Sequence, residues 1–172
     1  MAVGLVGVSC AGMTVSDAKG GSQDIAITVV TTVKPSCSIS NTSPVIDFGD
    51  LTKSGSVSVK IGLSCNSRFK FVFSSQNGGL ALGISKPVRA PFLAKVPYTL
   101  SYNLDTSAGA VADLCYSDNM IDGTSACVSE TPPNSSALSK SLTLGFHWES
   151  GEGVPLAGAY RDVLAFRVSP RL

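Results

Sequence analysis

The stretch that most clearly indicates the fold runs from Ser56 to Phe73 and reads SVSVKIGLSCNSRFKFVF. Its first half alternates apolar side chains with polar or small ones, and its second half repeats the alternation with aromatic residues. Since side chains on a β-strand point to opposite faces in turn, this period predicts two strands, each with one buried face. The inward positions are expected to be Val57, Val59, Ile61 and Leu63, followed by Phe69, Phe71 and Phe73.

Strand signals continue along the rest of the chain. The turn signal QNGG occupies residues 76–79, and further strands are predicted at residues 45–48, 98–104, 138–148 and 160–168. No segment sustains a helical period, although residues 108–114 could form one helical turn and residues 129–136 are expected to be a loop. This pattern predicts an all-β, antiparallel sandwich. Its inward positions include Tyr98, Leu100, Tyr102, Leu104, Leu138, Leu142, Leu144, Phe146 and Trp148.

Length and charge limit the function classes. The chain has 172 residues and a formal net charge of +1 at pH 7, and charged residues make up 15% of it. This length suits one domain with a sizeable core. A nearly neutral chain offers no strongly basic surface for nucleic acid, and no stretch reaches the roughly 20 apolar residues of a membrane span. We therefore expect no nucleic-acid partner and no direct membrane span.

The cysteines predict disulfides rather than a metal site. There is no C-x-x-C pair and only one histidine, so zinc or another metal cofactor is not predicted. If Cys10 is removed on maturation, four cysteines remain, which suits two disulfides formed in an oxidising compartment. Four cysteines allow three connectivities, of which we favour Cys37–Cys65 together with Cys115–Cys127.

Residues 1–18 are expected to be a signal or processing segment. Met1 to Ala11 reads MAVGLVGVSCA, which is apolar and ends in small residues, as a secretory signal does. Cleavage after Ala11 or after Ala18 would leave small residues at the cut. The basic residues that usually open a signal are missing before Lys19, so an apolar tail remains the alternative.

Residues 19–36 are predicted to be an N-terminal extension that precedes a domain at residues 37–172. Within it, residues 24–34 read DIAITVVTTVK, and this β-branched run predicts a strand that ends at Pro35. This strand could be donated to a neighbouring molecule. The alternative is an ordinary first strand that pairs within its own domain. One face of the predicted strand carries Ile25, Ile27, Val29, Thr31 and Val33.

The last predicted strand is expected to leave one sheet edge open. Leu164, Phe166 and Val168 lie on its inward face, and no later strand in the sequence follows it. An open apolar edge is an aggregation hazard unless another strand covers it. The simplest joint explanation is that the spare strand of one molecule fills the groove of the next, head to tail.

Several motifs, taken in order, resemble pilin subunits of chaperone–usher fimbriae, and in particular the spore coat U domain of archaic pili. They are CSIS at 37–40, IDFG at 46–49, VSVKIGLSCN at 57–66, SSQNGGL at 74–80 and YTLSYNL at 98–104. The ending PLAGAYRDVLAFRV at 155–168 is similar to the closing G-x-Y-x-D strand of that domain. The final residues, SPRL, depart from the alternating strand on which the family often ends.

The resemblance implies an incomplete immunoglobulin-like β-sandwich that lacks its final strand, with an N-terminal donor strand. It implies a structural subunit of a bacterial fimbrium (pilus), secreted through the periplasm to the cell surface and assembled by donor-strand exchange. The implied partners are neighbouring pilin subunits, a periplasmic chaperone and an outer-membrane usher. It also implies that the donor residues are those of the 25–33 face, and that Cys37–Cys65 corresponds to the family's usual bridge.

Other functions remain open. A fimbrial tip or minor adhesin would bind a host or abiotic surface in cell adhesion or biofilm formation, and a spore-coat structural protein would share the domain. A single domain with an extension favours a shaft or adaptor subunit over a tip. An enzyme is not predicted. The sequence contains no nucleophile motif such as G-x-S-x-G that could accompany His147, and no pair of carboxylates lies in a motif typical of a catalytic site. No cofactor is predicted.

Overall fold

The computed structural model describes residues 25–40, 44–84, 87–121, 127–151 and 153–171. The chain divides into two parts between Val33 and Lys34, and all strands described below belong to the second part. The predicted signal segment at 1–18, with Cys10 in it, and residues 19–24 lie outside the described residues.

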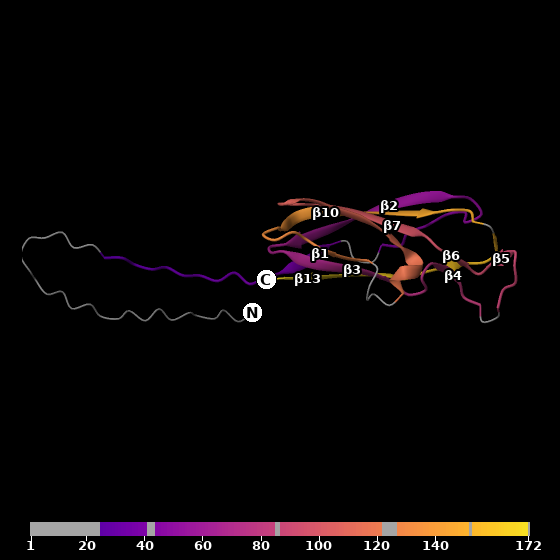
Figure 1. The fold of residues 1–172 in the computed structure, drawn as a ribbon, viewed down its shortest axis with the longest axis horizontal. Helices are drawn as coiled ribbons and strands as arrows, with labels where there is room; N and C mark the ends of the chain where they lie inside the picture. Colours follow the sequence, from indigo (N-terminus) through magenta and orange to yellow (C-terminus); the bar gives the residue numbers. More distant parts are fainter. Residues whose placement is uncertain (1–24, 41–43, 85–86, 122–126, 152, 172) are drawn as a thin grey trace, which may run out of the picture. The chain divides into compact units, whose positions relative to one another are not determined.

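The larger sheet has five strands in the order β1-β2-β10-β7-β8, and every neighbouring pair in it is antiparallel (Figure 1). The long strands β2 and β10 run side by side with Gly55 opposite Trp148 at one end and Ala137 opposite Cys65 at the other. The five strands are β1 (Cys37–Ser40), β2 (Gly55–Cys65), β7 (Thr99–Thr106), β8 (Gly109–Tyr116) and β10 (Ala137–Trp148).

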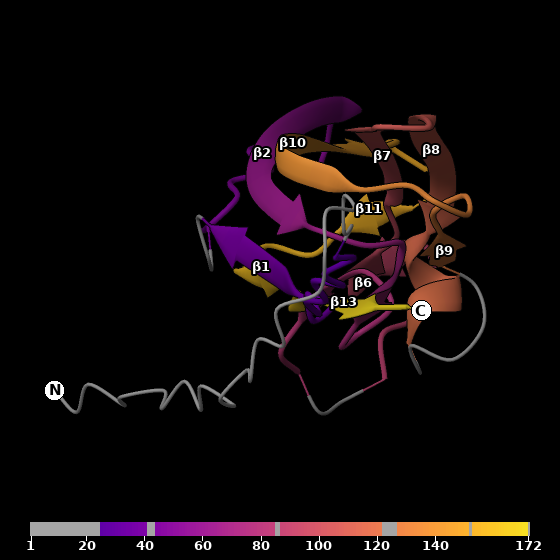
Figure 2. The same ribbon diagram turned by 90° about the vertical axis from the view of Figure 1, so that its left-hand side faces the viewer.

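The second sheet has the order β13-β3-β9 and is also antiparallel (Figure 2). It consists of β3 (Phe69–Ser75), β9 (Val128–Glu130) and β13 (Leu164–Pro170). Short strands extend the structure beyond the ends of these sheets: β4 (Leu80–Leu82) pairs with β6 (Lys95–Val96) and β12 (Tyr160–Arg161), and β5 (Phe92–Leu93) pairs with β11 (Val154–Pro155). A single 3₁₀ turn, η1 (Ser117–Met120), follows β8.

The two main sheets share one hydrophobic core, which makes the domain a β-sandwich. Phe71 and Tyr102, from opposite sheets, place their ring centroids 5.1 Å apart, and Phe73 stacks on Phe166 at 4.9 Å. These separations are typical of favourable aromatic pairs. Most of the predicted inward residues are buried, with Phe69, Phe71 and Phe73 fully inaccessible, whereas Val57 and Val59 are partly exposed. The all-β prediction is therefore confirmed.

Both expected disulfides are present. Cys37–Cys65 joins β1 to the end of β2, where the two residues face each other in the ladder. Cys115–Cys127 joins β8, at the edge of the larger sheet, to the residue before β9, at the edge of the smaller one. The second bridge therefore ties the two sheets together along one side of the sandwich.

Several local expectations were wrong. Residues 45–48 form no strand, and the strand predicted at 160–168 is interrupted at residues 162–163. Residues 108–114 are not helical, because β8 follows a tight turn at residues 107–108 and pairs with β7 along its whole length. Leu138 is exposed, because a bulge between Ala137 and Lys140 shifts the register of β10. The predicted loop at 129–136 begins later than expected, because β9 pairs with β3 as far as Glu130.

Candidate strand-acceptor groove

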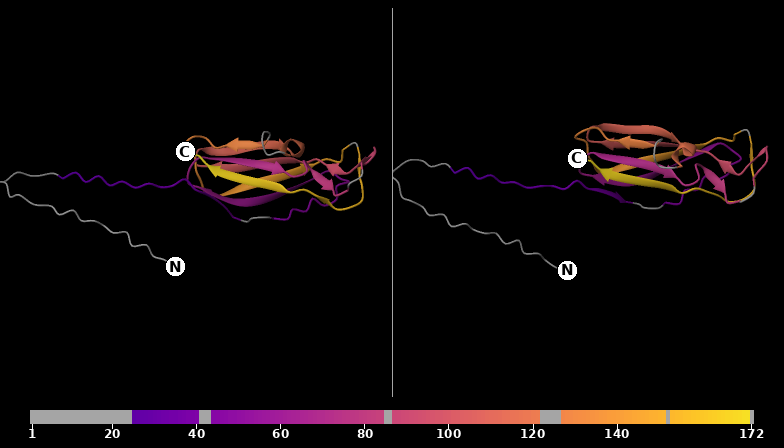
Figure 3. Two further views of the ribbon diagram at one scale, coloured as in Figure 1. Left: turned by 90° about the horizontal axis from the view of Figure 1, so that it is seen from below. Right: turned by 60° about the horizontal axis from the view of Figure 1, so that its bottom comes forward.

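The edge of β13 is the most conspicuous unpaired edge of the sandwich. One side of β13 pairs with β3 from Leu164 opposite Ser75 to Pro170 opposite Phe69. The yellow β13 lies beside β3 in both views of Figure 3. Among the described residues, no strand pairs with its other side. Backbone N–H and C=O groups along such an edge are available to another strand.

The apolar side chains beside this edge are only partly buried. Leu164, Phe166 and Val168 all point inward but are partly exposed, whereas the neighbouring Phe71 and Phe73 on β3 are inaccessible. Across the opening, Ile39 on β1 and two valines on β2, Val57 and Val59, are partly exposed too. Partly exposed apolar side chains thus occur on β1 and β13, which approach each other, and on β2 beyond the residues that pair with β1.

On the opposite side of the sandwich the two sheets are bridged. There β8 and β9 form the sheet edges, and the Cys115–Cys127 disulfide spans them. Both cysteines and the nearby Met120 are buried, whereas Val111 on β8 is partly exposed and Asp113 is exposed. The β1–β13 side has no such bridge between the sheets, because its disulfide joins β1 to β2 within one sheet.

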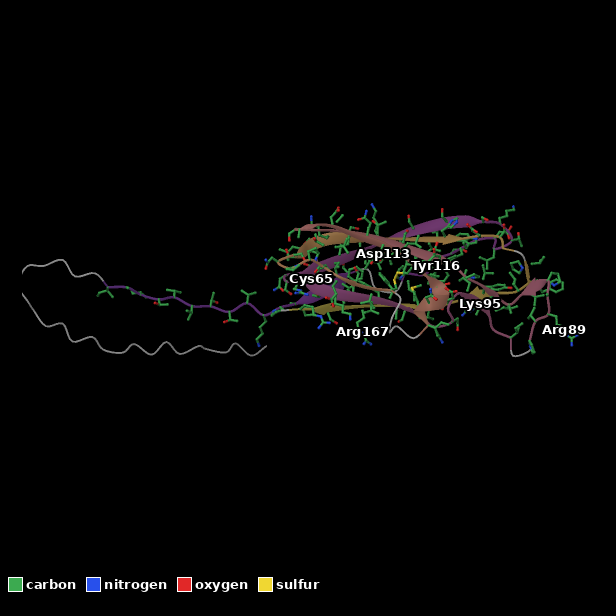
Figure 4. All side chains as sticks on the ribbon, viewed as in Figure 1. Cys65, Arg89, Lys95, Asp113, Tyr116 and Arg167 are labelled. Atoms are coloured by element: carbon green, nitrogen blue, oxygen red, sulfur yellow. A yellow bond between two sulfur atoms is a disulfide. The ribbon has the colours of Figure 1, made fainter. Side chains whose placement is uncertain are left out.

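A charged side chain further distinguishes the two sides. Asp113 on the edge strand β8 has the same parity as the inward-facing Cys115 and lies opposite the buried Tyr102 (Figure 4). Burial, together with the nearby Asp113 charge, raises the pKa of the Tyr102 phenol. An inward charge on an edge strand opposes pairing with another chain. The inward row of β13 is apolar, and its Arg167 lies on the outward face (Figure 4).

A cleft of about 520 Å³ lies among residues 46–52, Leu80 and residues 155–160. Residues 46–52 form one wall and residues 155–160 the other. Phe48 anchors the first wall, because its ring centroid lies 5.0 Å from that of Trp148 and 5.6 Å from that of Phe146. Tyr160 anchors the second wall, because its hydroxyl donates a hydrogen bond to the Leu93 carbonyl at 2.7 Å.

Asp162 fixes the start of β13. Its carboxylate accepts hydrogen bonds from the hydroxyls of Ser75 at 2.6 Å and Tyr98 at 2.8 Å, and from the N–H groups of Asn77 at 3.0 Å and Val163 at 2.8 Å. Burial and the adjacent Asp162 carboxylate raise the pKa of the Tyr98 phenol well above its usual range. The phenol therefore remains a donor, and the network ties β13 to the turn after β3.

The predicted donor residues do not form a strand in the described structure. Residues 25–36 are outside every strand, and the side chains of Ile25, Ile27 and Val29 are 70%, 82% and 87% exposed. Thr31 and Val33 are exposed as well. The apolar side chains of this face are therefore not buried among the described residues.

The residues that follow the donor face are held by Asn66. The Ser36 N–H donates to Asn66 Oδ1 at 2.7 Å, and Asn66 Nδ2 donates to the Lys34 carbonyl at 3.0 Å. The Asn66 N–H adds a bond to the Ser36 carbonyl at 3.1 Å. Sequence reasoning missed this contact, since an asparagine after a cysteine carries no signal for a linker partner.

The described residues assemble none of the other candidate sites that were considered from the sequence. His147 lies on the outer face of β10, where its Nε2 is 3.7 Å from Glu149 Oε1. In the described ranges, His, Cys, Asp and Glu side chains form no cluster of three or more that could hold a metal ion. None of the helices among the described residues is long and apolar enough to cross a membrane.

Comparison with known proteins gives no family assignment: no family model and no curated protein matches this chain.

Proposed function

We propose that this protein is a structural subunit of a bacterial surface fimbrium, assembled by donor-strand exchange. In this account the domain is an immunoglobulin-like sandwich that lacks one strand, and residues 25–33 of a neighbouring copy supply it. The observation that carries the proposal is the edge of β13, where an unpaired backbone adjoins a row of partly exposed apolar side chains.

The donor face has the chemistry that this groove requires. A strand added to β13 would satisfy its free backbone groups and alternate its side chains in and out. Ile25, Ile27, Val29, Thr31 and Val33 would enter the groove, and each fully buried valine or isoleucine would contribute roughly 1.5–3 kcal/mol. Nothing needs to be unfolded for this exchange, since these side chains are already exposed.

The same groove explains the need for assembly factors. An open apolar edge in an exported subunit would promote non-specific association before assembly. A periplasmic chaperone that lends a strand, and an outer-membrane usher that exchanges it for the next subunit, would keep the edge covered throughout. The two disulfides are compatible with folding in an oxidising compartment such as the periplasm.

A pair of substitutions on opposite faces of the donor segment tests the proposal. Val29→Asp places a charge on the face that enters the groove, while Val30→Asp places the same charge one residue away, on the other face. Burying a carboxylate in an apolar groove costs several kcal/mol, so Val29→Asp should abolish polymers and Val30→Asp should retain them. The measurement is the ladder of oligomers on a gel run without boiling.

If both variants lose the oligomer ladder equally, the added charge or a change in solubility would explain the loss, rather than insertion of one face of the segment into the groove. Polymers that persist in Val29→Asp would reject the donor role of this segment.

A further inference from the structure

The outer face of the smaller sheet is strongly basic. Since side chains alternate along a strand, the buried phenylalanines of β3 turn the residues between them, and their partners on β9 and β13, towards solvent. The Arg171 N–H donates to the Arg68 carbonyl at 2.8 Å, which continues the outward rows beyond the end of β13. The charged residues of this surface, here called the basic face, are Arg68, Lys70, Arg167, Arg171 and Glu130.

Glu130 neutralises only a small part of this charge. Its carboxylate oxygens lie 3.6 Å from the Arg68 guanidinium and 3.6 Å from that of Arg171, so one anion is shared between two cations. Arg68 Nε has no hydrogen-bond partner in the described part of the chain. Among the described residues, Lys70 and Arg167 form no ion pair. Four cations and one carboxylate leave the basic face with an excess of positive charge.

The arrangement of these cations does not serve the fold. Arg167 pairs with Val72, and Lys70 lies two residues before Val72 on β3, so the two cations are diagonal neighbours, roughly 7–8 Å apart. Like charges repel each other at this distance. Both side chains also point away from the core, so neither contributes to its packing. A cluster of this kind favours a role in binding an anion.

The positive charge belongs to one face and not to the whole chain. The formal net charge of the chain is only +1 at pH 7. On the larger sheet, the outward positions of β2 and β7 carry one charge of each sign, Lys60 and Asp105, among serine, threonine, glycine and asparagine. An anionic partner would therefore be attracted to the smaller sheet.

The chemistry of the basic face fits an acidic polysaccharide. Guanidinium groups bind carboxylates through two parallel hydrogen bonds, and Ser74 and Ser169 place hydroxyl groups among the cations, where sugar hydroxyls can exchange hydrogen bonds. The described outward positions of β3, β9 and β13 hold no aromatic side chain on which a nucleic-acid base could stack. A three-stranded sheet is also broader than the helix or two-stranded ribbon that the major groove admits. A second copy of this chain carries a net positive charge itself.

We propose that the outer face of the smaller sheet binds a linear acidic polysaccharide, whose carboxylates pair with the four cations of the basic face. The inference goes beyond strand exchange and concerns a single domain. Arg167 lies on the outward face of β13, so a strand added beside β13 would leave it accessible (Figure 4). In a fibre every subunit would present the face, and many weak contacts would act together.

The test measures binding of the full-length Val29→Asp protein to immobilised alginate, a linear polymer of uronic acids, with neutral dextran as the reference. Lys70→Gln and Lys60→Gln are a matched pair, because each removes one ammonium group from an outward position of a strand that has a neighbour on both sides. Lys70→Gln should weaken binding to alginate about two- to fivefold at low salt, and Lys60→Gln should leave it unchanged. The difference should disappear at 1 M salt.

Stability separates a binding role of Lys70 from a structural one. Because Lys70 and Arg167 repel each other, Lys70→Gln should keep or slightly raise the free energy of unfolding in urea while it weakens binding. Arg167→Gln, added to Lys70→Gln, should weaken binding by a further two- to fivefold. A fall in the unfolding free energy that parallels the loss of binding would assign these cations to the fold and overturn the proposal.

Three binding results would also overturn it. Equal loss of binding in Lys60→Gln and Lys70→Gln would show that alginate responds to net charge rather than to one face. Tighter binding of duplex DNA than of alginate, at equal concentrations of anionic groups, would make the partner a nucleic acid. Self-association at low salt that Lys70→Gln abolishes would make it a second copy. The oligomer ladder of the wild-type chain reports on strand exchange alone, so the two proposals fail separately.

Discussion

Asp162 shows how a single side chain prepares the candidate groove. A carboxylate that accepts four hydrogen bonds holds the first residues of β13 against the turn after β3, which fixes where the open edge begins. Hydrogen bonds to a charged group contribute more than neutral ones, about 1.5–3 kcal/mol each. The sequence resemblance singled out this aspartate within the closing motif, but only the structure shows its partners.

Replacement of Tyr98 by phenylalanine tests this network. Loss of the hydroxyl leaves the Asp162 carboxylate with one donor fewer in a partly buried site, so the free energy of unfolding should fall by about 1–3 kcal/mol at pH 7. Urea denaturation measures this, and Tyr116→Phe, at an exposed position on β8, is the matched control. An unchanged unfolding free energy would mean that the hydroxyl contributes nothing to the network.

The pH dependence of stability follows from the same phenol. Its pKa is raised in the folded state, whereas the unfolded chain has the ordinary value of about 10. Because the folded state holds the proton more tightly, this contribution is complete below pH of about 10 and is lost as the pH rises further. The wild-type protein should therefore lose stability more steeply above pH 10 than Tyr98→Phe does in denaturation series at matched pH values.

At the scale of the strand, the edges of the two sheets are treated differently. β8 carries Asp113 on its inward side, and β9 is three residues long, whereas β13 offers seven residues with an apolar inward row. Short or charged edges resist pairing. The contrast favours β13 as the edge that accepts a strand.

Removal of the charge from β8 should create a second adhesive edge. Asp113→Val, made in the Val29→Asp background, should cause concentration-dependent association in sedimentation experiments, because an apolar inward residue would no longer oppose pairing. Ala112→Val, on the outward face of the same strand, is the control and should remain monomeric. Association in both variants would show that added hydrophobicity, rather than the lost charge, is responsible.

The sequence predicts the long strands well and the short ones poorly. Alternation of the three phenylalanines 69, 71 and 73 identified β3 and its buried face, since period two is visible over seven residues. β8 was missed because its inward row mixes Val111, Asp113 and Cys115, and the charge conceals the alternation. The two-residue strands β5, β6, β11 and β12 are too short to show any period.

The candidate site was predictable only in part, for a similar reason. The inward row of β13 could be read from alternation, because all of its side chains belong to one strand. The cleft formed by residues 46–52 and 155–160 could not, since Phe48 is positioned by packing on Trp148 and Tyr160 by a hydrogen bond to Leu93. Contacts between distant segments leave no local periodicity.

At the scale of the whole molecule, the Cys115–Cys127 disulfide bridges the two sheets on one side of the sandwich, and on the other side β13 presents an edge that no described strand pairs with. A chain that lends a strand from one end of its domain and receives one along an open side makes a head-to-tail contact. Such contacts do not close on themselves and so generate fibres. The account therefore predicts an open polymer rather than a symmetric dimer.

Amide hydrogen exchange along β13 shows whether a second strand pairs with its unpaired edge. The comparison is between wild-type polymers and the Val29→Asp monomer, resolved residue by residue across Leu164–Pro170. The account predicts that the β13 amides that do not bond to β3 exchange freely in the monomer and become protected in the polymer. Polymers in which these amides still exchange freely, while β8 gains protection instead, would contradict it.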